Sequence, residues 1–541
     1  MKRFLIIAIL LVAVPCWGAD YTRYISESTG SEANDGTSNA QAWKELDHIE
    51  DDAHGASDTY IYLLLCGDVW SKAAGDWGNV GDSILIDGDA NITVGAYYMD
   101  GGTPRTVDGS TYICPGDKPK IDGEKVAFPT DSFDSQFRIQ GESSYITIQD
   151  VWLTNYDRGV QILPVNGTTD DQTYITLTRI QTNNMAREGI YQGYKTTGTA
   201  SYVTVSYCEI YDSELAFPAG AGGWGQALSF HYGDNITINN NIVGRSYGEG
   251  IMVSENVNTA DIYNNLVYNT DSVGIYSIMS HYVNIYNNYV IHSDSSYDNG
   301  GGRSNTGIGF GPEHDTDNVA FVETSGNVIR SNVVIGYDNC FGTSGGGDDA
   351  DTWEDGPGGV NYVINNTFID CDRSFSLYGT DNGATFQNNL FVINTPAITA
   401  FTLNTSPPYG YVFSGNGWDE SEARDTDFCT SGDCTTSGDV TGDPDLVDPT
   451  PCDTNWRECT LWNTPSWGDA ALGASSDFLG NATDLGAEAS YPMLAAESDW
   501  PLSVVTENQT NGAWNFGAYE AAAASPTAPW SGVSCQGCVM N

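Results

Sequence analysis

The stretch from residue 235 to 293 nearly repeats itself three times. It reads NITINNNIVGRS at 235–246, ADIYNNLVYNT at 260–270 and YVNIYNNYVIHS at 282–293. Each copy holds a short alternation of apolar and polar residues, a pair of asparagines and a second apolar segment. Recurrence at a near-constant period is typical of stacked repeat architectures. The chain is therefore expected to form similar coils on both sides of this stretch.

Three columns of residues extend the pattern to nine copies. The second asparagine of each pair belongs to the column Val151, Ile180, Cys208, Asn241, Asn265, Asn288, Asn332, Asn366 and Asn389. Two residues later stands the column Leu153, Thr182, Ile210, Val243, Val267, Val290, Val334, Phe368 and Phe391. A third column, most of whose members follow a glycine, is Val160, Ile190, Leu228, Ile251, Ile275, Ile308, Phe341, Phe375 and Ile398.

These columns predict three short strands per coil, each stacked on the same strand of the next coil. The shortest interval, 23 residues, is too short for a strand–helix–strand unit, which needs about 30. Asparagine suits the bends because it tolerates a left-handed backbone. We expect an all-β fold, a right-handed parallel β-helix in the form of a single-stranded solenoid, over residues 20–403. Nine coils spaced at roughly 4.8 Å make a rod about 40 Å long.

The opening and closing segments carry a family resemblance. The opening YIS…NDGTS…AWK (24–44), the strand KPKIDG (118–123) and the asparagine column resemble secreted bacterial proteins of the pectate-lyase-like right-handed parallel β-helix superfamily. The resemblance covers about residues 21–415. NFGAYE (515–520) is similar to the DIGAYE-like segment that closes such proteins, so 404–520 is expected to form a loop-rich C-terminal cap and 521–541 a flexible tail.

Charge and targeting signals restrict the partners. Residues 1–19 have the basic start, apolar core and small cleavage residues of a signal peptide, so the protein is expected to be secreted, with a cell-surface role for the tail left open. The 71 acidic and 20 basic residues give a net charge of −51, which disfavours nucleic acid. No later stretch is apolar enough for membrane insertion. We expect a monomer with an extracellular polysaccharide as partner.

The cysteines suggest disulfides in an exported chain. Cys429 and Cys434, Cys452 and Cys459, and Cys535 and Cys538 form close pairs in the sequence. Cys208 instead falls on the inner column, where an inert buried thiol is expected.

The third strand of each coil is the expected floor of a binding groove. Inserted loops at 212–226, 293–306, 312–325 and 344–359 flank it, and long loops on a rigid scaffold often carry function. Its outward positions offer carboxylates, an imidazole and aromatic rings, which suit sugar binding. The catalytic candidates are Glu188, Glu249, His231, Lys195, Arg187 and Arg303, and the substrate-binding candidates are Tyr191, Gln226, Ser229, Tyr276, Arg373 and Tyr378.

Three functions stay open at this point. The resemblance implies a calcium-assisted lyase of a uronate-containing polymer, with a Lys or Arg base and Ca²⁺ held by the acidic loop of Asp348, Asp349 and Asp351. An inverting glycoside hydrolase would use Glu188 and Glu249, which the coils place about 9–10 Å apart, near the upper end of the inverting range. The third alternative is a non-catalytic carbohydrate-binding or cell-surface protein.

Overall fold

The structure, a computed structural model, describes most of the chain up to residue 403 and short segments beyond it. The described residues are 19–403, 411–419, 434–437, 439–442, 476, 492–494 and 504–506. Within 19–403 the undescribed residues are 53, 56, 73–82, 126–133, 164–170, 194–198, 217–224, 294–304, 312–323, 344–359, 378–383 and 393–400.

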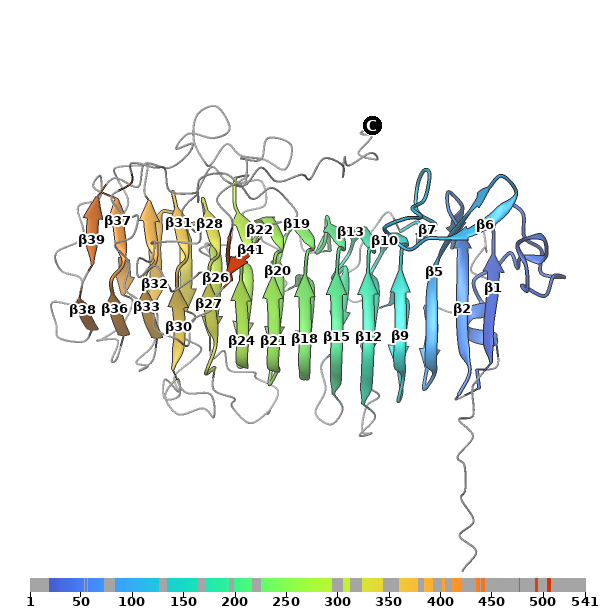
Figure 1. Cartoon of the computed structure of the whole chain (residues 1–541), viewed down its shortest axis with the longest axis horizontal. Coiled ribbons are helices and arrows are strands. Elements are labelled where there is room, and N and C mark those ends of the chain that lie inside the picture. The colour runs from blue at the N-terminus through green and yellow to red at the C-terminus, as the bar shows by residue number, and fades with distance from the viewer. Residues whose placement is uncertain are drawn as a thin grey trace, which may run out of the picture.

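Three long parallel sheets run along the molecule, and most coils contribute one strand to each sheet (Figure 1). Sheet A contains β1 (Asp20–Ile25), β2 (Thr59–Leu65), β5 (Ala90–Asp100), β9 (Ser144–Gln149), β12 (Gln172–Thr178), β15 (Ala200–Ser206), β18 (Gly233–Asn239), β21 (Asn258–Tyr263), β24 (His281–Tyr286), β27 (Val328–Arg330), β30 (Asn361–Ile364), β33 (Ala384–Gln387), β36 (Tyr411–Ser414) and β38 (Cys434–Ser437). An antiparallel strand, β6 (Thr103–Thr106), pairs with β5 at its side.

The second and third strands of the coils form the other two sheets. Sheet B contains β3 (Val69–Ser71), β7 (Lys120–Asp122), β10 (Trp152–Tyr156), β13 (Gln181–Met185), β16 (Glu209–Tyr211), β19 (Ile242–Ser246), β22 (Leu266–Thr270), β25 (Tyr289–Ile291), β28 (Val333–Ile335), β31 (Thr367–Ile369), β34 (Leu390–Val392), β37 (Gly417–Asp419) and β39 (Val440–Gly442). Sheet C contains β4 (Ile84–Asp87), β8 (Ser135–Gln140), β11 (Arg158–Leu163), β14 (Ile190–Gln192), β17 (Gln226–His231), β20 (Glu249–Ser254), β23 (Val273–Ile278), β26 (Thr306–Gly311), β29 (Asn339–Thr343), β32 (Arg373–Leu377) and β35 (Phe401–Leu403).

Little else in the described chain is regular. A 3₁₀ turn, η1 (Asn39–Gln41), and one short helix, α1 (His48–Asp51), lie near the start, and β40 (Pro492–Leu494) pairs antiparallel with β41 (Val504–Thr506). No helix among the described residues is long and apolar enough to cross a membrane.

The stacked sheets confirm the predicted right-handed parallel β-helix. The third column is in register from Val160 to Phe375, but Phe375 pairs with Phe401, so the prediction of Ile398 was wrong by three residues. The coils also continue past the expected boundary at residue 403, because β36 to β39 still belong to sheets A and B. The inner side chains form one continuous hydrophobic core along the rod.

The asparagine pairs divide two tasks at the corner between sheets A and B. The first member, such as Asn264 with φ of 55°, takes the left-handed backbone of the bend. The second member, such as Asn265, is fully buried and bonds the next coil. Its backbone N–H and its Nδ2 both donate to Oδ1 of Asn288, at 2.9 and 3.0 Å. The same bonding links the column from Asn241 through Asn416 to Asp439.

Glycines shape the corner where the chain enters sheet C. A Cβ on Gly274 would lie 2.5 Å from Cγ1 of Val290 and 2.6 Å from the carbonyl oxygen of Gly307. A Cβ on Gly307 would lie 2.2 Å from Cγ1 of Val334. Only glycine fits these positions, because two consecutive residues face the interior here. The residue before each glycine therefore faces outward, and sheet C gains an outward position at its start.

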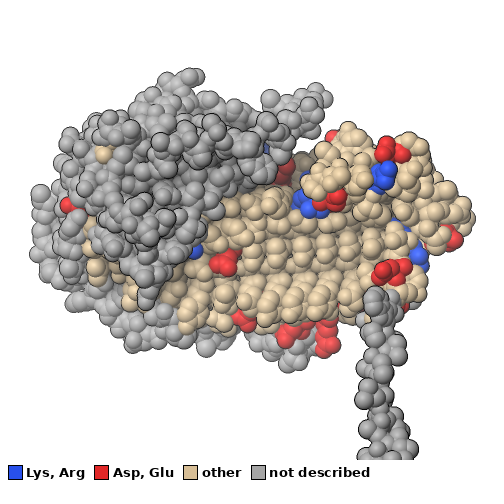
Figure 2. Space-filling model, viewed as in Figure 1, with Lys and Arg blue, Asp and Glu red and all other residues tan. Residues whose placement is uncertain are grey.

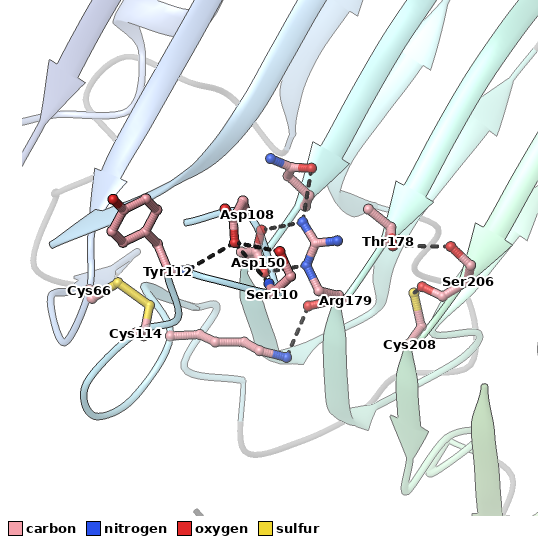
Figure 3. A network of polar contacts seen from close by, with 12 residues as sticks. Cys66, Asp108, Ser110, Tyr112, Cys114, Asp150, Thr178, Arg179, Ser206 and Cys208 are labelled. Carbon is pink, nitrogen blue, oxygen red and sulfur yellow. Dashed lines mark hydrogen bonds and ion pairs between the residues drawn. A yellow bond between two sulfur atoms is a disulfide. The ribbon is translucent and has the colours of Figure 1, made fainter. Parts of the chain in front are cut away.

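A polar network braces the first coils (Figure 3). Arg179, on the turn after β12, binds both carboxylate oxygens of Asp150 at 2.7 and 2.8 Å. The segment after β6 packs against this pair, since the position of a Cβ on Gly109 lies only 2.4 Å from Nε of Arg179. A disulfide between Cys66 and Cys114 anchors the same segment, and it is absent from the pairs predicted from the sequence.

A second disulfide joins Cys340 to Cys371. Cys340 takes the corner position that Gly307 holds one coil earlier, so its side chain faces the interior and meets the next coil. The six cysteines of the three predicted close pairs lie outside the part of the chain whose side chains are described. Cys208 is buried and free, as expected.

Candidate active site on the outer face of sheet C

The start of sheet C carries a row of side chains that are polar in every coil from Arg158 to Arg373 except the coil of Val273. It contains Arg158, Glu188, Gln226, Glu249, Thr306, Asn339 and Arg373, and strand pairing places Gln226 opposite Glu249, Thr306 opposite Asn339 and Asn339 opposite Arg373. At Arg158, Glu188 and Glu249 the next residue is a corner glycine, and at Gln226, Asn339 and Arg373 it is Ala227, Cys340 or Ser374. A small residue at this corner lets the residue before it face outward although it stands two positions before an inward residue.

Arg158 and Glu188 form a buried ion pair at the N-terminal end of the row. Nε of Arg158 lies 2.5 Å from Oε2 of Glu188, and the two residues are only 4% and 3% exposed. The guanidinium also lies over the ring of Tyr191, 4.3 Å from its centroid. The pKa of Arg158 is raised: burial lowers it, and the nearby Glu188 carboxylate outweighs that effect. Glu188 is thus held by a cation and is not a free carboxylate on an open shelf.

Glu214 adds a carboxyl group that the sequence did not single out. It lies on the loop after β16, and this loop returns beside the preceding coil through bonds from the N–H of Glu214 to the oxygen of Arg187 (3.1 Å) and from Leu215 to Met185 (3.1 Å). A Cβ on Gly225 would fall 1.5 Å from Cδ of Glu214. The carboxyl group therefore rests directly on the glycine backbone that leads into β17.

The carboxyl group of Glu214 is buried and lies near two other carboxyl groups and two arginines. The residue is 1% exposed, and neither oxygen has a hydrogen-bond partner among the described residues. Burial, followed by repulsion from Glu188, raises its pKa well above the usual 4.5, and Arg187 and Arg158 offset part of this rise. Glu249 acts in the same direction as Glu188. Glu214 is therefore protonated under conditions where an exposed glutamate is ionised.

We call Glu188, Glu214 and Glu249 the carboxylate cluster. Glu249 is 3% exposed, and its backbone N–H donates to the oxygen of Gly225 (2.9 Å), so the same glycine positions Glu249 and Glu214. At the edge of the cluster, Tyr191 and Arg187 are partly exposed. The cluster places a glutamate whose pKa is raised by burial and a neighbouring carboxylate beside a second glutamate that pairs with an arginine. Acid–base catalysis uses carboxyl groups whose environments differ in this way.

His231 lies one coil below Tyr191, with the two ring centroids 5.6 Å apart. Nδ1 of His231 is 2.7 Å from Oγ of Ser254 and 3.3 Å from Oε2 of Glu255. The imidazole is thus oriented by the next coil and belongs to a second polar group beside the carboxylate cluster.

The other predicted residues have different surroundings. Tyr276 is 3% exposed and packs with Met252, Ile278 and Met279 in a small apolar cluster on the outer side of sheet C. Ser229 is fully buried and Gln226 is 8% exposed. Arg373 is partly exposed at the far end of the row. The predicted Lys195, Arg303, Tyr378, Asp348, Asp349 and Asp351 lie outside the described residues.

One group of described side chains has the composition of a metal site, and it lies near the start of the chain, where α1 packs beside β4 at the end of sheet C. Glu32, Asp47 and His48 bring one ligand atom each within 4.8 Å of one another. Their groups are already occupied, because Oε1 of Glu32 accepts the N–H groups of Lys44 and Glu45 and its Oε2 contacts Nε2 of His48 at 2.7 Å. This cluster braces the first coil.

Comparison with known proteins gives structural neighbours only. No protein-family model matches the sequence, and no curated protein matches it. Pectate lyase Pel9A shares 14% identity over 91% of this chain and 96% of its own, with a TM-score of 0.49. A GH136 lacto-N-biosidase from Eubacterium ramulus shares 13% identity over 74% of this chain and 67% of its own, with a TM-score of 0.43. The A-module of mannuronan C-5 epimerase AlgE4 from Azotobacter vinelandii shares 12% identity over 77% of this chain and 97% of its own, with a TM-score of 0.39. Its own stacked sheets make this chain a right-handed parallel β-helix, the fold of the superfamily that the sequence resembles.

Proposed function

We propose that the chain is an exported carbohydrate-active protein that hydrolyses a glycosidic bond at the carboxylate cluster. Glu214 serves as the general acid that protonates the leaving oxygen, and Glu249 serves as the base that activates water. Burial and the neighbouring Glu188 carboxylate keep Glu214 protonated, against the opposing effect of Arg187 and Arg158. The observation that carries the proposal is the buried Glu214 carboxyl, without a hydrogen-bond partner among the described residues and placed between two carboxylates.

The chemistry of glycoside hydrolysis supports these roles. It needs two carboxyl groups in opposite protonation states, and it proceeds through a cation-like transition state that negative charge stabilises. A general acid contributes most when its pKa lies near the working pH, and burial beside like charge moves a glutamate in that direction. Tyr191, partly exposed beside the cluster, offers a ring for a sugar face. The polysaccharide class itself comes from the sequence resemblance, and the two disulfides are compatible with export.

The test is a panel of neutral and uronate-containing polysaccharides assayed for new reducing ends and for the absorbance of unsaturated products. Glu214→Gln and Glu249→Gln should each lower reducing-end release by at least about a hundredfold. Glu209→Gln is the matched control, because Glu209 stands on sheet B and only contacts Tyr211. Thermal unfolding of all variants separates a catalytic loss from a folding loss. Unchanged reducing-end release by Glu214→Gln would remove the cluster from consideration.

The calcium-assisted lyase remains a prediction that the same panel decides. Its acidic loop and two of its basic candidates lie outside the described residues. A lyase would give unsaturated products on uronate polymers, and a chelator would abolish them. Binding to a polysaccharide without either product would indicate a non-catalytic module.

A further inference from the structure

The outer face of sheet A differs in chemistry from the rest of this acidic chain. The strands β9, β12 and β15 read SYITIQ, QTYITLT and ASYVTVS and contain no Asp, Glu, Lys or Arg, although the chain has 71 acidic residues. Figure 2 shows this area as an uncharged surface, with acidic side chains along its lower border. A protein with net charge −51 thus keeps these three neighbouring strands free of charge, whereas β18 and β21 of the same sheet contain Asp234 and Asp261.

Two rows of side chains on this face follow the rod axis. Tyr145, Tyr174 and Tyr202 stack with centroids 4.8 Å apart and ring planes within 7° and 11° of parallel. Beside them, Thr147 pairs with Thr176 and Thr176 with Thr204. We call these six residues the tyrosine–threonine face. None of the six hydroxyl groups bonds to another described residue, so all of them are available to a ligand.

The tyrosines occupy a position that does not favour them. All three have φ of 56–57°, in the left-handed region where a bulky residue is an outlier at a cost of roughly 1–2 kcal/mol each. The same position holds Asn91, Asn235, Thr259 and Tyr282 in other coils, all with positive φ, so the left-handed backbone belongs to the coil, and asparagine suits it better than tyrosine. The three rings are 56%, 45% and 49% exposed, so core packing does not account for them. Strained residues of this kind cluster at functional sites.

We propose that the tyrosine–threonine face is a docking platform for an extended, uncharged polysaccharide strand that lies along the rod axis. A pyranose ring is comparable in size to a phenol ring, so such a strand offers about one sugar to each coil. Rows of hydroxyl groups can donate to and accept from sugar hydroxyls, and the ring edges between them contact the apolar C–H groups. The absence of cations on the face and the charge of the chain exclude a polyanion. The platform lies on a different sheet from the carboxylate cluster and is independent of the proposed hydrolysis.

The experiment compares two tyrosine-to-asparagine variants of the full chain. The triple variant Tyr145→Asn, Tyr174→Asn and Tyr202→Asn removes the rings and relieves the strained backbone. The matched control is Tyr207→Asn, because Tyr207 is also left-handed (φ 55°) and 56% exposed but stands at the end of β15 outside the stack. Both variants should unfold at or above the wild-type temperature, because asparagine suits the left-handed backbone better than tyrosine. The probes are amorphous cellulose, colloidal chitin, glucomannan, xyloglucan and xylan, with polygalacturonate and alginate as polyanions.

The wild type and the control should bind at least one neutral probe, and the triple variant should bind it at least about tenfold more weakly, which is about 1.4 kcal/mol. Glu214→Gln should bind like the wild type, so loss of hydrolysis and loss of docking are distinguishable. Equal binding by the triple variant, or no binding of any neutral probe by the wild type, would overturn the proposal. A dimeric wild type that becomes monomeric in the triple variant would assign the face to contact between two copies instead.

Discussion

Replacing Asn265 by alanine tests the internal bonding that sets the coils. Oδ1 of Asn265 accepts the backbone N–H and the Nδ2 group of Asn241, both at 3.0 Å. Its own Nδ2 donates to the oxygens of Ile238 and Asn288, both at 3.0 Å. Alanine removes all four bonds. The backbone N–H and Nδ2 of Asn241 and the carbonyl of Ile238 then lose these partners in a buried region. At about 1–2 kcal/mol for each such group, the loss is about 3–6 kcal/mol.

The neighbouring residue provides the control for this prediction. Asn264 stands on the left-handed bend with φ of 55°, and glycine adopts this conformation without steric cost. Asn264→Gly should therefore stay within about 1 kcal/mol of the wild type. Urea unfolding followed by circular dichroism, with limited proteolysis to detect opening of single coils, measures both variants. If the two substitutions cost the same, or if Asn265→Ala costs less than about 1 kcal/mol, the division of tasks within the asparagine pair is wrong.

Four further outcomes follow from the site and the core. Glu188→Gln should destabilise the fold by about 3–5 kcal/mol, because it leaves the buried Arg158 without its counter-charge; calorimetry against Glu249→Gln checks this. Because the folded-state pKa of Glu214 is raised, the folded protein binds more protons than the unfolded protein above pH 4.5. The free energy of unfolding of the wild type should therefore fall relative to that of Glu214→Gln as the pH rises from 4.5. Gly274→Ala should lower the unfolding temperature, whereas Gly309→Ala, whose nearest contact is 3.2 Å, should change it little. Burial raises the pKa of Cys208 to about 12, so peptide mapping should find it unlabelled by maleimide in the folded protein and labelled in urea.

The fold was predictable because its repeat is carried by internal side chains. Asn241, Asn265 and Asn288 bond directly to one another, and this geometry restricts the residue type at each copy, so the column is visible in a single sequence. Loops between strands are under no such restriction. Counting a constant distance from Asn389 therefore gave Ile398, whereas the paired residue is Phe401, three residues later.

The site was predictable only in part, for a related reason. The coil pattern located the outward row of sheet C and thus Glu188 and Glu249. It could not show that Arg158 pairs with Glu188, because side-chain partners between coils depend on rotamers. Glu214 belongs to the inserted loop 212–226, whose path no repeat describes, and the glycine at 225 beneath it was the one local signal. The disulfides join Cys66 to Cys114 and Cys340 to Cys371, which are 48 and 31 residues apart, so sequence proximity did not find them.

The stabilising contacts of the coil lie inside it, and this frees its outer faces for different chemistry. At one corner the asparagine column bonds coil to coil, and at the other the glycines let the chain turn against the core. Neither device uses the outward residues of sheets A and C. An outer face with an unfavourable arrangement, such as the buried carboxyl groups around Glu214 or the left-handed tyrosines of sheet A, therefore has no evident structural reason in the coil. Each costs stability that the asparagine column and the core must offset, and for this reason we place both proposed ligand sites on the outer faces.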